Sequence, residues 1–289
     1  MKKISLVLSG GGARGIAHLG VLEELEKQDY EIHSITGTSM GAVVGGIYAA
    51  GKIREFKKWI LNLDKIDIFK LVDFTLFNNG FIKGDKVFEA ISPFISNRQI
   101  QDLPIRYSAT ATDLVGKKEV LFTEGSLYDA LRASIAIPNV LTPVVKEDAI
   151  LVDGGVVNNI PINHAHRMDN DLLVAVNVNA DIPLIDTEIK NKEKESLYQS
   201  AMAKFSKNLR ELFSNDANND LNYFDIMNVS FELMRNEMDK ISLKNTPPDI
   251  LIETSRDRCK IYDFYKAEEL IALGRKATVM ALKRHTNPS

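Results

Sequence analysis

Two consecutive strand–turn–helix units at the start of the chain limit the folds open to it more than any other feature. An apolar run over residues 3–8 ends in a glycine-rich turn, and apolar residues then recur at helical spacing over residues 16–27. A second apolar run over residues 32–36 repeats this order and leads into a helix of small residues over 42–50. Strands that alternate with helices in this way are typical of an open α/β sheet.

The alternation continues along the chain. Helical spacing predicts amphipathic helices over residues 52–63 and from Asp85 onward, and Ser126 with Asp129 forms a capping-box-like start of a short helix. A C-terminal helix is predicted over residues 264–283. Further strands are predicted over residues 105–110, 120–122, 150–152, 172–178 and 250–252.

The composition changes to Lys, Glu, Asn and Met from about Asp186 to Asn245, and the apolar residues keep helical spacing there. We interpret residues 186–245 as a helical insertion or cap of unknown role. It separates a core over residues 1–185 from residues 246–289, in which the last strand and the C-terminal helix are expected to pack back on the core. The length of 289 residues allows one elaborated domain or two, and no linker divides the chain.

Charge and cysteine content exclude several classes of function. The formal net charge is −3, without the basic excess of a dedicated nucleic-acid binder, so no nucleic-acid partner is predicted. The single cysteine, Cys259, cannot form an internal disulfide. No run approaches the roughly 20 apolar residues that span a bilayer, and the first apolar run is too short for a signal peptide. We expect a cytoplasmic protein, with peripheral membrane contact left open.

The first glycine-rich turn has two properties of an anion-binding loop. Glycines let the backbone approach a ligand closely, and the first amides of a helix have no partner within the helix. The spacing of its glycines also fits a dinucleotide fingerprint, and Glu31 lies near the distance at which an acidic residue would bind the ribose. The residues alone leave both interpretations open. The turn consists of Gly10, Gly11, Gly12, Ala13, Arg14 and Gly15.

The second turn is a G-x-S-x-G motif in which Gly37 and Gly41 flank Ser39. Between a strand and a helix, such a motif forms a sharp elbow that exposes the serine hydroxyl, and the positive end of the following helix lies beside a developing oxyanion. Ser39 is therefore the candidate nucleophile. The ordinary α/β-hydrolase fold does not fit, because that fold places several strands before its elbow and a catalytic histidine after its acidic residue.

A third motif supplies an acid–base group in place of histidine. The predicted strand over residues 150–152 runs into Asp153, which Gly154 and Gly155 follow. We expect Asp153 to emerge at the carboxyl edge of the sheet, beside Ser39. An aspartate in a partly desolvated cleft can act as a general base if its surroundings raise its pKa.

The histidines offer no clear alternative. His18 falls within the first predicted helix and His33 at a strand start, so both are predicted to have structural roles. His164 and His166 are two residues apart without a third ligand nearby, so no metal site is predicted.

Together, the three motifs resemble those of the patatin-like phospholipase family, and in particular of its bacterial members, both in their order along the chain and in their residues. The first turn resembles the family's oxyanion loop, Ser39 its nucleophile and Asp153 the dyad partner in its D-G-G/A motif. Residues 80–85 and 133–138 are similar to further segments of bacterial members. The resemblance covers about residues 3–180. It implies a three-layer α/β/α sandwich with a mostly parallel central sheet.

The resemblance also implies a reaction, the hydrolysis of fatty-acyl esters of lipids through a Ser39–Asp153 dyad and an acyl-enzyme intermediate, without metal or organic cofactor. Ser39 would attack the ester carbonyl and Asp153 would accept its proton. Amides of Gly11, Gly12 and Ala13 would hold the oxyanion. Arg14, in the same loop, would orient it, attract an anionic head group or simply be a solvated arginine at the start of the helix.

Three other functions are compatible with parts of the sequence. A dinucleotide-binding protein would use residues 10–15 and Glu31, but it leaves Ser39 and the D-G-G motif unexplained. A general carboxylesterase for soluble esters would use the same dyad, and an idle lipid-binding scaffold would keep only the fold. Apolar residues that could line an acyl channel, or simply pack in the core, are Ile68, Phe69, Leu71, Phe74, Leu76, Phe77 and Phe81. A second group that could form a lid, a dimer contact or a buried face consists of Tyr223, Phe224, Ile226, Met227, Phe231 and Met234.

Overall fold

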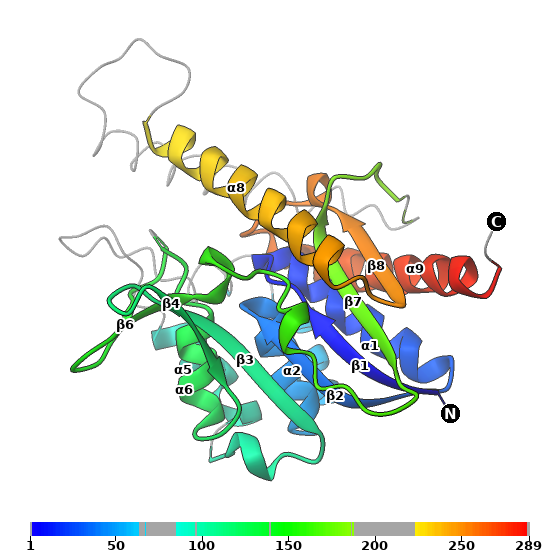
Figure 1. The fold of residues 1–289 in the computed structure, drawn as a ribbon, viewed down its shortest axis with the longest axis horizontal. Helices are drawn as coiled ribbons and strands as arrows, with labels where there is room; N and C mark the ends of the chain where they lie inside the picture. Colours follow the sequence, from blue (N-terminus) through cyan, green and yellow to red (C-terminus); the bar gives the residue numbers. More distant parts are fainter. Residues whose placement is uncertain are drawn as a thin grey trace.

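The central sheet is built around the two strands that come first in the sequence. The computed structural model describes residues 2–63, 67, 85–95, 97–138, 140–185, 187 and 223–287. Within them the strand order is β5-β6-β3-β2-β1-β7-β8, and β4 joins β3 outside this path (Figure 1). The strands are β1 (Lys2–Leu8), β2 (Tyr30–Thr38), β3 (Arg106–Asp113), β4 (Lys118–Phe122), β5 (Val144–Val145), β6 (Ile150–Asp153), β7 (Leu172–Ala180) and β8 (Ile250–Ser255).

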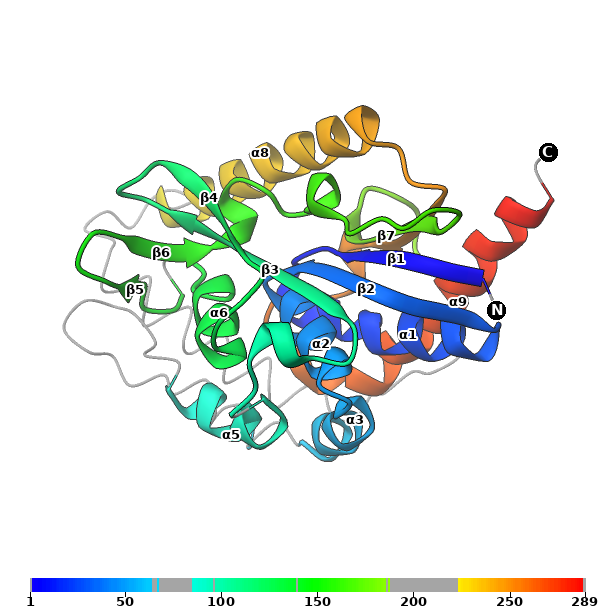
Figure 2. The same ribbon diagram turned by 60° about the horizontal axis from the view of Figure 1, so that its bottom comes forward.

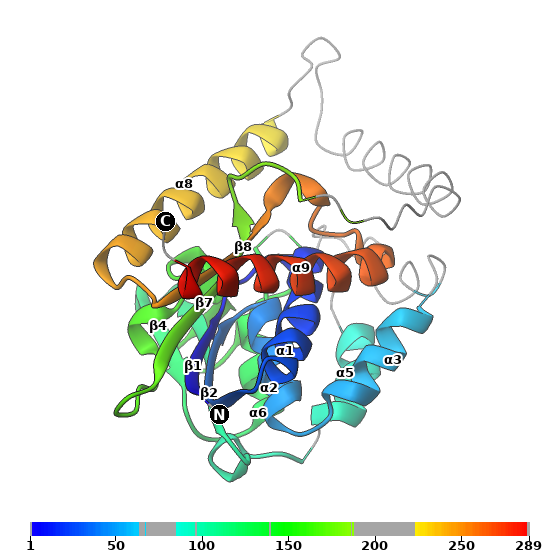
Figure 3. The ribbon, with the colours of Figure 1, turned by 90° about the vertical axis from the view of Figure 1, so that its right-hand side faces the viewer.

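Helices cover both faces of this sheet. Those in the described part of the chain are α1 (Ala17–Lys27), α2 (Met40–Ala49), α3 (Ile53–Asn62), α5 (Asp85–Ile95), α6 (Leu127–Ser134), α8 (Tyr223–Asn245) and α9 (Ala267–Thr286). Figure 2 shows α1, α2, α6 and α9 on one face and α8 on the other. In Figure 3, α9 lies beside α1. The three-layer α/β/α arrangement and the helix that follows the core are therefore confirmed.

Strand directions are mixed, although the strands at the centre are parallel. β1 is parallel to both β2 and β7, β2 to β3, and β7 to β8. β4 and β6 are antiparallel to β3, and β5 is antiparallel to β6. The sequence did not predict β5, because two residues are too few to show a periodic pattern.

The apolar side chains form separate clusters on the two faces of the sheet. The larger cluster joins β1 and β2 to α1, α2 and α9. A smaller one on the other face contains Val7, Ile160 and Leu173, and Leu243 of α8 packs against it. The helix within the predicted insertion is thus attached to the core, while residues 188–222 lie outside the described part.

The register of the central strands brings the sequence motifs together. Leu8 pairs with Gly37, so the glycine-rich loop and the elbow leave neighbouring strands side by side. Thr38 pairs with Thr110 of β3, and Ala111, the next residue, pairs with Asp153. All three motifs therefore meet at the carboxyl ends of β1 and β2.

Candidate active site

Ser39 stands at a strained turn between β2 and α2. Its φ and ψ angles are 53° and −125°, a left-handed backbone that a residue with a side chain rarely adopts. Its amide donates a hydrogen bond to Oγ of Ser134, at the end of α6, over 2.8 Å. Gly41 makes the turn possible, because a Cβ there would lie 2.4 Å from the carbonyl oxygen of Leu8. The sharp elbow predicted for the G-x-S-x-G motif is present.

Asp153 is the hydrogen-bond partner of the Ser39 hydroxyl. It ends β6, and its carboxylate also accepts a hydrogen bond of 2.7 Å from the amide of Gly155. Its place beside Ser39 agrees with the prediction, but the reason differs. β6 runs antiparallel to β3, and Asp153 reaches the site because β6 pairs only with the last residues of β3, from Ala111 to Asp113.

Burial controls the proton affinity of Asp153. Desolvation in this buried position raises the pKa of the carboxyl group from 3.8 to about 6. The hydrogen bonds from Ser39 and Gly155 and the positive charge of Arg235, in α8, lower the pKa but only partly offset the burial. Asp153 is therefore ionised at neutral pH and basic enough to take a proton.

The glycine-rich loop has fewer free amides than the sequence suggests. The amide of Ala13 donates to the carbonyl oxygen of Ile261 over 2.8 Å, and the amide of Gly10 to that of Asn159 over 3.1 Å. Ala13 is thus occupied as a donor, which differs from the role expected for it. The amides of Gly11 and Gly12 have no acceptor among the described residues.

Arg14 orients this loop. Its guanidinium group donates to the carbonyl oxygen of Cys259 over 3.1 Å, to Oδ1 of Asn179 over 2.8 Å and to Oε1 of Glu232, in α8, over 3.2 Å. Asn179 in turn donates to the carbonyl oxygen of Gly10 over 2.7 Å. Of the three interpretations of Arg14, these contacts support the one in which it orients the loop, because its donors are bound within the protein and its side chain is buried.

An apolar cavity of about 140 Å³ opens beside the nucleophile. Ser39 and Gly12 lie at its wall, and the remaining lining comes from α2, α3, α5 and two loops, none of which the sequence marks as a channel. The candidate channel residues between Ile68 and Phe81 lie outside the described part. The cavity is lined by Gly12, Ser39, Met40, Val43, Phe56, Trp59, Ile60, Leu63, Val87, Ile91, Ile135, Ile137, Val140, Leu141, Ile261, Tyr262 and Phe264.

Three further residues near the dyad were not predicted. Asn159, whose carbonyl oxygen accepts from Gly10, uses its side-chain amide to donate to Asp239 of α8 over 2.8 Å. Arg235, one turn before Asp239, is the cation that acts on Asp153. Neither Arg235 nor Asp239 could be singled out from the sequence, because charged residues in a helix usually face solvent.

The histidines have structural roles or lie away from the dyad. His18 is fully buried and bonds the carbonyl oxygen of Ser9 over 2.9 Å, and burial lowers its pKa to about 4. His164 bonds Glu119 over 2.8 Å. Within the described ranges, no group of three or more His, Cys, Asp or Glu residues is arranged to hold a metal ion.

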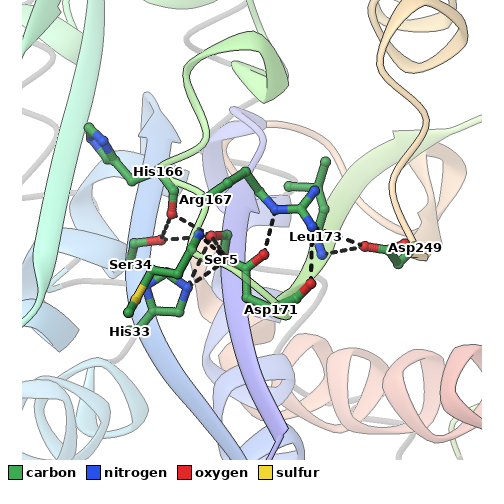
Figure 4. A network of polar contacts seen from close by, with 9 residues as sticks. Ser5, His33, Ser34, His166, Arg167, Asp171, Leu173 and Asp249 are labelled. Carbon is green, nitrogen blue, oxygen red and sulfur yellow. Dashed lines mark hydrogen bonds and ion pairs between the residues drawn. The ribbon is translucent and has the colours of Figure 1, made fainter.

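A second set of Ser, His and Asp residues lies on the sheet face under residues 164–171 (Figure 4). Both Ser5 and His33 bond the same carboxylate oxygen of Asp171, over 2.6 and 2.7 Å. A catalytic triad has a different order, with histidine between serine and acid. Ser5 is also fully buried, so this set stabilises the packing of residues 164–171 on β1 and β2.

The fold and the site define an α/β protein with a serine–aspartate pair at the carboxyl edge of its central strands. Residues 6–166, more than half of the chain, match the family model described as patatin-like phospholipase. The chain belongs to the patatin-like phospholipase family. Its membership of this family supports a lipid hydrolase function.

Comparisons with individual proteins agree with this family. An uncharacterised NTE family protein of Mycobacterium tuberculosis is 31% identical over 97% of this chain and 91% of its own length. Lysophospholipase NTE1 of Saccharomyces cerevisiae is 31% identical over 61% of this chain but only 11% of its own. The crystal structure of VipD from Legionella pneumophila has the same fold, with a TM-score of 0.51 and 15% identity over 98% of this chain and 67% of its own.

Proposed function

We propose that the protein is a lipid acyl hydrolase of the phospholipase or lysophospholipase type, which cleaves fatty-acyl esters through Ser39 and Asp153. The main support is that the hydroxyl of Ser39 donates to the buried carboxylate of Asp153 and lies at the wall of an apolar cavity. A nucleophile, its base and a site for an acyl chain therefore lie together.

The reaction proceeds in two halves. Ser39 attacks the ester carbonyl while Asp153 accepts its proton, and the proton then passes to the leaving alcohol as the acyl-enzyme forms. Asp153 next takes a proton from the water that attacks the acyl-enzyme, and it returns this proton to Oγ of Ser39 as the bond to Ser39 breaks and the fatty acid leaves. The free amides of Gly11 and Gly12, next to the nucleophile, support the negative charge of the oxyanion in each half.

The lining of the cavity favours an ester with a long acyl chain as the substrate over a small soluble ester. Its walls are almost entirely aliphatic and aromatic side chains, such as Phe56, Ile91 and Leu141, and such walls stabilise methylene groups removed from water. The dinucleotide alternative has less support, because two amides of the glycine-rich loop, those of Gly10 and Ala13, are already bound within the protein.

A peripheral contact with lipid is supported by α8. No helix in the described part of the chain has both the length and the apolar character to cross a bilayer. The second group of apolar residues is not a buried face, since its described side chains are exposed. Exposed apolar side chains on α8 are Ile226, Met227, Val229, Phe231, Leu233, Met234 and Ile241.

Hydrolysis assays test the proposal. We expect the wild type to release fatty acid from long-chain acyl esters, and Ser39→Ala and Asp153→Asn to lose activity by at least about a thousandfold. Thermal unfolding of each variant shows that it is folded. Activity that survives Ser39→Ala would refute the mechanism, and equal rates on soluble short-chain and long-chain esters would favour a general carboxylesterase.

A further inference from the structure

Helix α8 presents one polar face to the active site. Glu232, Arg235 and Asp239 are three and four residues apart, so they share a side of the helix. Glu232 accepts a hydrogen bond from Arg14 of the glycine-rich loop, and Asp239 accepts one from Asn159. Arg235 lies between them in the sequence, and the face that carries it therefore contacts both sides of the site.

Arg235 differs from its two neighbours because its guanidinium group has no hydrogen bond to any described residue. Among the described residues it forms one ion pair, from Nη2 to Oε1 of Glu232 at 3.8 Å, an oxygen that already accepts from Arg14. The carboxylates of Asp239 and Asp153 also act on its charge, without a hydrogen bond to it. Only 14% of the side chain is exposed, and Nε is buried without an acceptor. A buried donor without an acceptor is costly, so this group is suited to bind an anion.

The location of Arg235 places such an anion beside the dyad. A Cβ built on Gly155 would lie 3.0 Å from Oδ1 of Asp153 and 3.9 Å from Cδ of Arg235. The arginine thus stands next to the D-G-G turn and acts electrostatically on Asp153. When Asp153 accepts the proton of Ser39 it loses its charge, and Arg235 then interacts more strongly with a bound anion than before.

Building on the proposed function, we propose that Arg235 binds the phosphate of a phospholipid or lysophospholipid while Ser39 attacks an acyl ester of the same molecule. The planar guanidinium group matches the oxygens of a phosphate in a bidentate way. In glycerophospholipids only the short glycerol backbone separates the phosphate from the ester, which suits a cation next to the dyad. Arg235 would then set the preference for phosphate-bearing over neutral lipid esters.

Paired substrates test this assignment. Hydrolysis of lysophosphatidylglycerol and of monoacylglycerol with the same acyl chain is measured at about pH 8, above the pKa of Asp153, so that dyad ionisation does not differ. We expect Arg235→Gln to lower kcat/KM for the phosphate-bearing lipid by about 10- to 100-fold and to leave the neutral lipid within about threefold. Arg235→Lys should keep part of the preference.

A matched control comes from the same helix. Lys240 is exposed on α8, and Lys240→Gln removes a positive charge of the protein without touching the site, so both substrates should be unaffected. Thermal unfolding of each variant checks the fold. Equal losses on both substrates in Arg235→Gln would overturn the assignment, because they would show that Arg235 acts only through the dyad or the packing of α8.

A binding measurement separates this inference from the proposed function. If the wild type hydrolyses neither lipid, the proposed function fails, and titration of Ser39→Ala protein with lysophosphatidylglycerol decides the role of Arg235 alone. Arg235→Gln in that background should weaken binding of this lipid about tenfold or more, and unchanged binding would overturn the site. Competition by inorganic phosphate at concentrations equal to the lipid would assign the site to free phosphate and overturn a head-group site.

Discussion

At the scale of single residues, the site depends on the balance that sets the pKa of Asp153. Burial raises the pKa of this carboxyl group, and the Ser39 hydroxyl, the Gly155 amide and the charge of Arg235 lower it again in part. The resulting value of about 6 leaves the base ionised near neutral pH yet much more basic than an exposed aspartate. A buried carboxylate can therefore do here what a histidine does in a Ser-His-Asp triad.

This balance predicts the pH dependence of the reaction. Asp153 must be ionised to accept the proton of Ser39, so kcat/KM of the wild type should fall tenfold per pH unit as the pH decreases below about 6. A rate profile with a soluble acyl ester, measured where the fold is intact, checks this. An acid limb near pH 4, the range of an exposed carboxyl group, would contradict the account.

At the scale of the elements, the sequence predicts the parts of the site that are encoded locally. Glycine-rich turns after two apolar runs are enough to place the loop and the elbow side by side, because neighbouring parallel strands end at the same edge. The antiparallel direction of β6 was not predictable, since the short apolar run Ile150–Asp153 is compatible with either a parallel or an antiparallel strand. The role of α8 was equally hidden, because Asp239 bonds Asn159, which lies 80 positions earlier in the chain, and Arg235 acts on the distant Asp153.

The loop that carries Gly11 and Gly12 is held in place by Arg14. Arg14→Met removes the hydrogen bonds to Cys259, Asn179 and Glu232, so the loop amides should lose their alignment with the oxyanion. We expect kcat to fall by about 10- to 1000-fold with a smaller change in KM, since the oxyanion exists only after attack. Steady-state kinetics on folded protein measure this, and an unchanged kcat would refute the role of the loop.

At the scale of the whole molecule, the apolar cavity brings several helices and loops together beside the nucleophile. Its walls come from α2, α3, α5 and the loops around residues 135–141 and 261–264, which are distant in sequence. No local pattern predicts such a cavity, because each of these apolar residues is also typical of an ordinary core. The cavity therefore emerges only from the packed fold.

A larger side chain in the cavity should change the preference for acyl chain length. Val43 of α2 lines the cavity and is almost fully buried, so Val43→Phe should lower kcat/KM for long-chain esters at least about tenfold more than for short-chain esters. Val145→Phe is the control, because Val145 is exposed on β5, and it should change neither rate. A Val43→Phe variant that is folded and keeps the wild-type preference would show that the acyl chain lies elsewhere.

The most direct test of the account is to identify the serine that a long-chain alkyl phosphonate labels, by mass spectrometry of the intact protein and of its peptides. We predict one adduct, on Ser39, absent in Ser39→Ala and formed far more slowly in Asp153→Asn, because no carboxylate is then present to accept the hydroxyl proton. An adduct on another serine, or labelling that persists in Ser39→Ala, would contradict the assignment of Ser39 as the nucleophile.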